Sequence, residues 1–257
     1  MPAKASILNL PDHNFIAYHK TQGKKNKPSI VFLGGFMSDM QGTKALALEE
    51  FCKENDYSFV RFDYFGHGES SGEFKKGTIG KWKENVLSVI DELTKGKLIL
   101  VGSSLGGWLM LLATLERSER VAGLIGIASA PDFTEKLIFD EMTDEQKKQM
   151  QDNGEFILES EYGDDPYPIS RELIEEARNH LLLDSKIEIN CPIRLFHGIL
   201  DADVPPDFSV QIGDLITSDN MCVNLIAGGD HRMSEPDNIE QYCEMIDELA
   251  KDIKESS

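Results

Sequence analysis

The segment that most constrains this chain is an apolar strand, a glycine turn and an apolar helix over residues 98–112. Its turn reads Gly102-Ser103-Ser104-Leu105-Gly106, which is a G-x-S-x-G pattern. Glycines on both sides let the chain reverse without a side-chain clash, so the hydroxyl of Ser104 can stand exposed on a strained backbone. This order of strand, turn and helix predicts a nucleophile elbow with Ser104 as the nucleophile. The alternative is a tight turn whose serine only caps the helix.

Strand-like and helix-like segments alternate along the rest of the chain. Near-continuous apolar runs predict buried strands at 29–36, 58–64, 98–102, 121–128, 192–197 and 221–227. Helices are expected between them, at 43–53, 79–94, 105–115, 170–182, 206–216 and 236–253. The alternation is typical of the α/β class, with a mostly parallel central sheet and helices on both faces. Residues 6–10 and 15–18 predict an antiparallel hairpin at the sheet edge.

One long connection interrupts this alternation, because residues 131–190 separate two consecutive strands by far more than the usual few residues. The sequence shows no linker or repeat, so we expect residues 1–257 to form one domain with a cap insertion at about 131–190. The insertion begins with an apolar cluster, followed by a polar, helix-like stretch. This cluster either lines an acyl pocket or only attaches the cap to the body. It consists of Phe133, Leu137, Ile138, Phe139 and Met142, of which Leu137 and Phe139 are the candidate substrate contacts.

The charge balance excludes several classes of function. The chain has 26 basic and 45 acidic residues and a formal net charge of -19, which repels nucleic acid and anionic lipid. No stretch approaches the roughly 20 apolar residues of a membrane span, and residues 1–7 lack the apolar core of a secretory signal. We therefore expect a soluble, intracellular protein that binds no nucleic acid and does not insert stably into a membrane.

The spacing of the cysteines also favours an intracellular protein. They lie far apart in the sequence, without a C-x-x-C pair and mostly among apolar neighbours. Such spacing favours reduced core thiols over a zinc site or a disulfide framework. The four are Cys52, Cys191, Cys222 and Cys243.

A serine hydroxyl is a poor nucleophile until a base takes its proton, so the elbow requires a histidine elsewhere in the chain. His231 is the candidate base, because it follows the last predicted strand and a histidine comes third in the order serine, acid, histidine. His197 ends a strand and is the next candidate, although it precedes the acid region and is expected to pack there. His67 lies in a glycine-rich turn, where we expect local hydrogen bonds. The remaining histidines, His13, His19 and His180, have no supporting context.

The base needs a carboxylate that fixes its tautomer and stabilises the imidazolium. Asp201 is the candidate, because it is the first acid after the strand that contains His197. Asp203 is the open alternative. Asp230 is a weaker third candidate, since its side chain and that of the adjacent His231 diverge in an extended loop.

Negative charge on the carbonyl oxygen must meet hydrogen-bond donors, and two backbone amides are candidates for this oxyanion hole. The Leu105 N–H lies at the positive start of the helix that follows the elbow. The Phe36 N–H follows the pair Gly34-Gly35 after the first buried strand, where the glycines either permit a close approach or only form a turn. Met37 and Trp108 are candidate substrate contacts, with core packing as the alternative.

Several of these patterns together resemble the α/β-hydrolase superfamily of serine hydrolases over essentially the whole chain. They are Gly34-Gly35-Phe36, Asp63-x-x-Gly66-x-Gly68, the elbow at Ser104, Asp201 with Val204-Pro205, and His231. Longer strings also resemble the family of mitochondrial palmitoyl-protein thioesterases that cleave mycophenolic acid acyl-glucuronide. These strings lie within 45–52, 61–64, 80–82, 101–111, 190–195 and 230–233.

The resemblance implies an α/β-hydrolase fold in which Ser104, Asp201 and His231 match the family's triad. It also implies hydrolysis of S-acyl-cysteine thioesters and activated carboxylic esters. The likeness is better in the catalytic body than in the cap after Phe133.

We therefore expect a serine hydrolase whose partners are small-molecule acyl esters or S-acylated proteins and peptides. An acyl-enzyme on Ser104 needs no metal or organic cofactor. Two alternatives are a generic small-molecule carboxylesterase and a non-catalytic homologue that only binds a ligand. The chain lacks the Arg- and Ser-rich amphipathic leader of a transit peptide, so a cytoplasmic location is expected, with the mitochondrial matrix as the alternative for a trimmed mature form.

Overall fold

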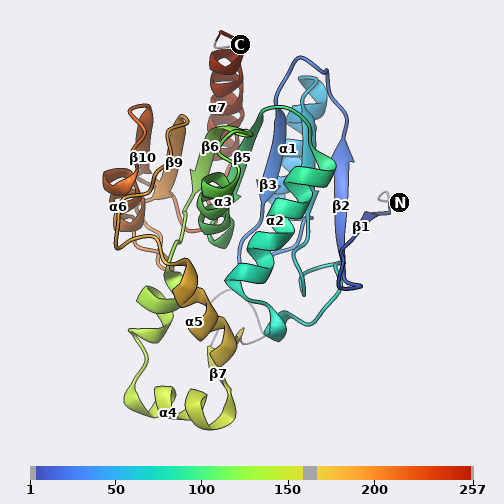
Figure 1. Ribbon diagram of the computed structural model, residues 1–257. Helices are drawn as coiled ribbons and strands as arrows, with labels where there is room; N and C mark the ends of the chain where they lie inside the picture. The colour runs from blue at the N-terminus through green and yellow to red at the C-terminus, as the bar shows by residue number, and fades with distance from the viewer. Residues whose placement is uncertain (1–3, 159–166, 256–257) are drawn as a thin grey trace.

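The computed structural model describes residues 4–158 and 167–255. Its centre is an eight-stranded sheet with the strand order β1-β2-β4-β3-β5-β6-β9-β10 (Figure 1). β2 is antiparallel to both of its neighbours, and the strands from β4 to β10 in that order are parallel. The mostly parallel sheet and its edge hairpin are therefore confirmed. The strands are β1 (Ser6–Asn9), β2 (Phe15–Thr21), β3 (Ser29–Leu33), β4 (Ser58–Phe62), β5 (Leu98–Ser103), β6 (Val121–Ile127), β9 (Ile193–Gly198) and β10 (Met221–Ile226).

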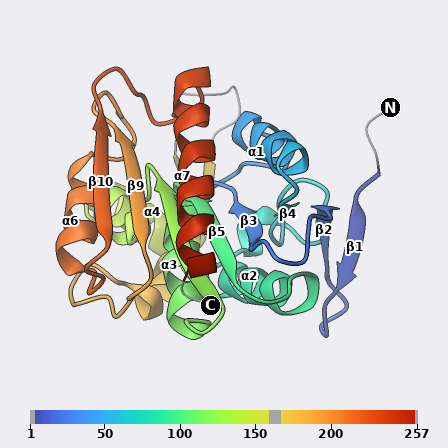
Figure 2. The ribbon, with the colours of Figure 1, turned by 90° about the horizontal axis from the view of Figure 1, so that it is seen from above.

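Helices cover both faces of the sheet, as predicted. α1 and α7 pack on one face, and α2, α3 and α6 pack on the other (Figure 2). Among the residues described, none of the helices is both long and apolar enough for a membrane span. The helices are α1 (Thr43–Glu54), α2 (Ile79–Leu93), α3 (Leu105–Glu116), α4 (Asp144–Asn153), α5 (Arg171–Ala177), α6 (Asp207–Leu215) and α7 (Pro236–Glu255).

The two helix layers explain why the predicted strands are apolar along their whole length. In β3, Ile30 and Phe32 are buried on the face covered by α1 and α7, whereas Val31 and Leu33 are buried on the opposite face. Successive side chains of a strand point to opposite faces, so a strand that is covered twice must be apolar at every position. Each such side chain contributes about 1.5–3 kcal/mol by leaving water. This burial fixes the strands whose ends carry the candidate site.

The cysteines follow the same layering, and all four are free thiols. Cys52 is buried in the core that α1 and α7 cover, as predicted. Cys222 is exposed, so its predicted core position is wrong. The reason is its place on β10, the last strand of the sheet, on the face opposite Met221 and Val223; α7, which covers that face, packs on β5 and β6.

The connection between β6 and β9 carries small elements of its own at the end of the sheet (Figure 1). A π-helix at Thr134–Phe139 precedes α4, whose start is fixed by a capping box between Thr143 and Gln146. The sequence missed the following hairpin of β7 (Glu155–Leu158) and β8 (Tyr167–Ser170), because such short strands show no clear alternation. The helix predicted over 170–182 also ends early, as α5 followed by a 3-10 turn at Arg178–His180.

The assignment of residues 1–257 to one domain with a cap at about 131–190 stays a prediction, and residues 159–166 of that range lie outside the described part of the chain.

Asp132 ties the two ends of this connection together. Its side chain is fully buried. The carboxylate accepts the backbone N–H of Leu182 at 2.8 Å and that of Leu183 at 2.8 Å. A buried N–H without a partner costs free energy, so this carboxylate satisfies two donors that the chain reversal leaves open. The entry and the exit of the connection are thereby held side by side.

Asp132→Ala should lower the free energy of unfolding by about 2–4 kcal/mol, because two buried N–H groups lose a charged acceptor. Asp132→Asn keeps one acceptor oxygen and tolerates the positive φ of 59° at this position. We expect it to lose roughly half as much. Urea unfolding followed by circular dichroism gives both values, and equal losses in the two variants would contradict the role of the carboxylate.

Candidate active site

Ser104 lies in a sharp turn between β5 and α3, with a φ of 55° and a ψ of -117°. The turn requires glycine on both sides. A Cβ on Gly102 would lie 2.4 Å from the carbonyl oxygen of Gly106, and a Cβ on Gly106 would lie 2.1 Å from that of Leu33. The Ser104 side chain makes no capping hydrogen bond to α3. The geometry therefore favours an elbow over a serine that only caps the helix.

Ser104, His231 and Asp201 come together at one edge of the sheet, although they are far apart in the sequence. His231 follows β10, and its Nε2 lies 3.1 Å from Ser104 Oγ. Asp201 follows β9, and its Oδ2 lies 2.8 Å from His231 Nδ1. Because Nδ1 faces a carboxylate, it carries the ring hydrogen, and Nε2 is left to accept the hydroxyl hydrogen of Ser104. This is the arrangement that removes a proton from a serine.

The Asp201 carboxylate is enclosed by donors, and its side chain has 0% exposure. Oδ1 accepts the backbone N–H groups of Asp203 at 3.0 Å and Val204 at 2.8 Å. Oδ2 accepts from His231 and also from His197, whose Nε2 lies 3.1 Å away. Burial acts to raise the pKa of Asp201, but the hydrogen bonds from His197 and His231 more than offset it, so this pKa lies well below its usual range. The carboxyl group is therefore ionised at neutral pH.

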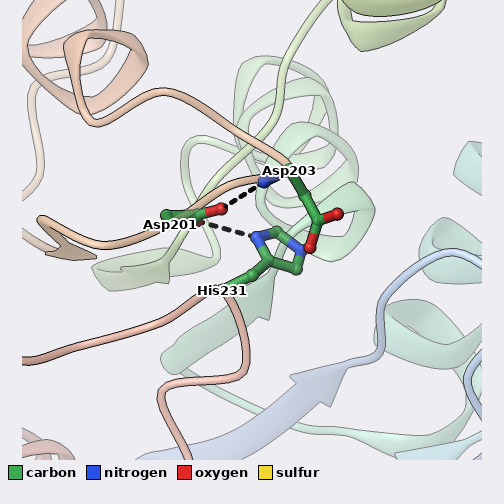
Figure 3. A group of neighbouring side chains, drawn as sticks. All are labelled: Asp201, Asp203 and His231. Carbon is green, nitrogen blue, oxygen red and sulfur yellow. Dashed lines mark hydrogen bonds and ion pairs between the residues drawn. The ribbon is translucent and has the colours of Figure 1, made fainter. Parts of the chain in front are cut away.

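Asp203, the alternative acid, is exposed and lies beside the same ring (Figure 3). One atom each of Asp201, Asp203 and His231 lies within 4.8 Å of the others, a grouping of the kind that can hold a cation. However, His231 already uses both ring nitrogens, on Asp201 and Ser104, and Asp201 uses both oxygens. These hydrogen bonds favour a Ser-His-Asp relay over a metal site.

Asp230, the third candidate, has a different part in the structure. Its Oδ1 accepts the backbone N–H of Met233 at 2.9 Å and so closes the turn that carries His231.

The loop that carries His231 is further held by two side chains. Lys44 on α1 donates to the carbonyl oxygen of Arg232 and, at 3.3 Å, to Ser234 Oγ. Burial lowers the pKa of Lys44 to about 8. The hydroxyl of Tyr242 on α7 donates to the carbonyl oxygen of Met233 at 3.0 Å. Sequence reasoning missed Lys44, because no local pattern shows that α1 packs beside this loop.

The predicted oxyanion-hole residues lie on both sides of Ser104. A Cβ on Gly35 would lie 3.5 Å from Ser104 Cβ, so the backbone that leads to Phe36 passes directly beside the serine. The Phe36 ring packs edge-on against Phe74, with ring centroids 4.9 Å apart, and so anchors this loop. Leu105 is the first residue of α3, where helical N–H groups have no partner within the helix. The roles of the Phe36 and Leu105 amides stay predictions.

The four candidate substrate contacts differ in accessibility. Met37 is 40% exposed, whereas Leu137 and Phe139 are half-buried and pack against the core. Trp108 is fully buried, and its indole N–H donates to the carbonyl oxygen of His180 at 3.0 Å. This burial favours the alternative of core packing for Trp108, and the four substrate contacts stay predictions.

His67 makes the local hydrogen bond that the sequence predicts, from Nδ1 to the carbonyl oxygen of Phe65 at 3.2 Å. Its ring packs edge-on against Tyr64, Phe74 and Trp82. Among the described residues, its buried Nε2 has no hydrogen-bond partner. Burial lowers the pKa of this ring to about 4.

Comparison with known proteins identifies related chains. Residues 28–164 match the alpha/beta hydrolase fold family. The human protein named palmitoyl-protein thioesterase ABHD10, mitochondrial, is 46% identical over 245 residues, which are 95% of this chain and 79% of that protein. The structure of alpha/beta hydrolase domain-containing protein 10 from mouse has a TM-score of 0.90 at 42% identity, covering 98% of this chain and 100% of that chain. A putative hydrolase from Agrobacterium vitis S4 has a TM-score of 0.92 at 34% identity, covering 97% and 100%.

These relatives correct one expectation. The cytoplasmic location predicted from the sequence is wrong, because the mammalian relatives of 43–46% identity are named as mitochondrial proteins. That prediction relied on the composition of the first residues, which lack an Arg- and Ser-rich amphipathic pattern.

The buried His67 should make stability depend on pH. The folded ring stays neutral down to about pH 4, whereas an ordinary histidine has a pKa of 6.5. Between these values the unfolded state binds more protons than the folded state. The free energy of unfolding therefore decreases as the pH is lowered from about 6.5 to about 4, by about 3 kcal/mol in total for this group. His67→Phe removes the titrating group, and urea unfolding across this interval should give a flatter pH dependence. The exposed His13→Asn is the control, and a wild-type slope in His67→Phe would contradict the assignment.

Proposed function

This chain belongs to the alpha/beta hydrolase fold family and is a hydrolytic enzyme, and we propose that it cleaves S-acyl-cysteine thioesters and activated carboxylic esters through an acyl-enzyme on Ser104. The observation that carries the proposal is the hydrogen-bonded series from Ser104 through His231 to Asp201. A protein that only binds a ligand needs none of these three side chains in register. The human relative's name, palmitoyl-protein thioesterase, supports the thioester class.

In the first step, His231 Nε2 takes the hydroxyl hydrogen of Ser104 while Oγ attacks the acyl carbonyl carbon. The ring then carries a positive charge between Ser104 and Asp201. The ionised Asp201 carboxylate, 2.8 Å from Nδ1, stabilises that charge and keeps the ring in the reactive tautomer. Because the carboxylate is enclosed, water screens this attraction only weakly.

Negative charge develops on the carbonyl oxygen at the same time. The Phe36 and Leu105 N–H groups are the proposed donors to this oxygen, each contributing about 3 kcal/mol to the transition state. Both are backbone groups, so their positions are fixed before the substrate arrives. The dipole of α3 adds to the contribution of Leu105.

The tetrahedral intermediate collapses when the bond from carbon to the leaving group breaks, and the imidazolium of His231 gives its hydrogen to the departing sulfur or oxygen, so that the ring is neutral again. A cysteine thiol has a pKa of about 8.5 and therefore leaves more readily than an alcohol, with less help from the imidazolium. Water then enters and attacks the acyl-enzyme while His231 takes one of its hydrogens; the bond from the acyl carbon to Oγ breaks, His231 returns the hydrogen to Oγ, and the acid is released. Met37, Leu137 and Phe139 are the proposed contacts for the acyl group, and the proposed setting is mitochondrial, as in the relatives' names.

A fluorophosphonate probe should label the wild-type protein and not Ser104→Ala, because the probe reacts with an activated serine oxygen. Ser103→Ala is a matched control, since Ser103 is the adjacent residue at the end of β5 and is not part of the series from Ser104 through His231 to Asp201; it should label like the wild type. The measurement is in-gel fluorescence after a timed reaction. Wild-type labelling of Ser104→Ala would remove the nucleophile, and an unlabelled wild-type protein would favour the ligand-binding alternative.

The substrate class is tested with two matched peptides that carry the same acyl chain, one on cysteine sulfur and one on serine oxygen. We expect kcat/KM for the thioester to exceed that for the oxygen ester by about tenfold or more, because the thiol is the better leaving group. Release of the free acid, measured by chromatography, gives both values. Equal rates, or a faster oxygen ester, would favour a generic carboxylesterase instead.

A further inference from the structure

His197 is a buried histidine that the proposed reaction does not use. It lies near the end of β9, directly behind Asp201, and its exposure is 0%. Its Nδ1 lies 2.7 Å from the hydroxyl oxygen of Ser209 on α6. Its Nε2 lies 2.9 Å from the carbonyl oxygen of Val204 and 3.1 Å from Asp201 Oδ2. Each ring nitrogen therefore has a partner, although the ring is closed off from water.

These partners determine where the ring hydrogen sits. Both groups that face Nε2, a carbonyl oxygen and a carboxylate oxygen, can only accept hydrogen bonds, so Nε2 must carry a hydrogen. A hydroxyl can both donate and accept, so Ser209 can give its hydrogen to the lone pair of Nδ1. The contacts thus place a hydrogen on Nε2, which donates toward Asp201, and allow Nδ1 to accept from Ser209.

The donated hydrogen bond reaches the same carboxylate oxygen that holds His231. Oδ2 of Asp201 lies between the two rings, 2.8 Å from His231 Nδ1 and 3.1 Å from His197 Nε2. Oδ1 is held separately by two backbone N–H groups of the same turn. His197 is therefore the one side chain, among the described contacts of Asp201, that joins the carboxylate to β9 instead of to a loop.

We propose that His197 is a positioning residue, which fixes the Asp201 carboxylate and through it the ring of His231. This inference rests on the proposed function. The hydrogen-bonded series then runs over five side chains, from Ser209 through His197, Asp201 and His231 to Ser104. A neutral donor suits the task, because it satisfies Oδ2 without cancelling the charge that Asp201 presents to His231.

Loss of this donor should change catalysis in two ways. The backbone N–H groups still hold Oδ1, but Oδ2 loses the donor that fixes it from β9. A displacement of about 1 Å at such a site lowers kcat on the order of 100-fold. KM should change little, because His197 does not touch the substrate. The carboxylate also becomes a stronger acceptor for His231, so the acid limb of the profile of kcat/KM against pH should move to higher pH. The charged or titratable side chains around Asp201 are His197 on β9, His231 after β10 and Asp203 in its own turn.

Two matched variants separate positioning from packing. The amide nitrogen of Gln can occupy the place of Nε2, so His197→Gln keeps a donor toward Asp201. The shorter Asn reaches only the place of Nδ1, so His197→Asn keeps a partner for Ser209 and loses Asp201. With a short-chain nitrophenyl ester, we expect His197→Gln to stay within about fivefold of the wild-type kcat and to keep its acid limb. His197→Asn should lose about 100-fold in kcat and move the acid limb upward.

Equal losses in the two variants with an unmoved acid limb would overturn the proposal, as would wild-type kinetics in His197→Asn. Nitrogen-15 spectra of the wild-type protein test it without any variant: a neutral His197 with its hydrogen on Nε2 supports the proposal, and a hydrogen on Nδ1 alone overturns it. Ser104→Ala keeps the two proposals apart. If that variant retains activity, the proposed function fails; if it is inactive while His197→Asn behaves like His197→Gln, only the present inference fails.

Discussion

The candidate site depends on one buried charge, the carboxylate of Asp201. An ionised group without exposed area is costly unless donors surround it, and here four N–H groups do so. Those donors come from β9, from the turn after it and from the loop after β10. The carboxylate can therefore stay charged only while these elements keep their relative positions. The negative charge of Asp201 would stabilise His231 during catalysis. The same charge requires that the strand ends and loops around it stay well ordered.

The backbone conformation of Ser104 is a second constraint on the fold. A φ of 55° at a serine is a strained conformation, and the surrounding packing must maintain it. The packing does so through backbone contact, because Gly106 lies so close to the Leu33 carbonyl oxygen that no side chain fits between them. The same contact brings the loop with Phe36 against Ser104. One close approach between β3 and α3 therefore sets both the strain of the serine and the position of the proposed oxyanion donors.

The features that could be predicted from sequence are those encoded within a short window. The strand, turn and helix around Ser104 follow from periodicity and glycine spacing, and the place of His231 follows from the order of the elements. Contacts between distant segments carried no such signal. Lys44 supports the His231 loop from α1, and Asp132 joins residues about fifty positions apart, so neither could be assigned before the packing was known. The burial of Trp108 could not be predicted either, because an apolar residue beside an elbow has the same sequence pattern whether it lines a pocket or packs in the core.

The choice between Asp201 and Asp203 is a case in which the local sequence holds more information than the strand order does. An aspartate at such a turn is held when its carboxylate accepts the N–H two and three residues further along. For Asp201 these residues are Asp203 and Val204, which both donate to Oδ1. For Asp203 the residue two positions on is Pro205, which has no N–H. Asp203 therefore lacks the donor that would anchor it, and its side chain remains exposed, whereas Asp201 is drawn inward against His197. Pro205, two residues before α6, thus favours burial of Asp201 over Asp203 beside the imidazole.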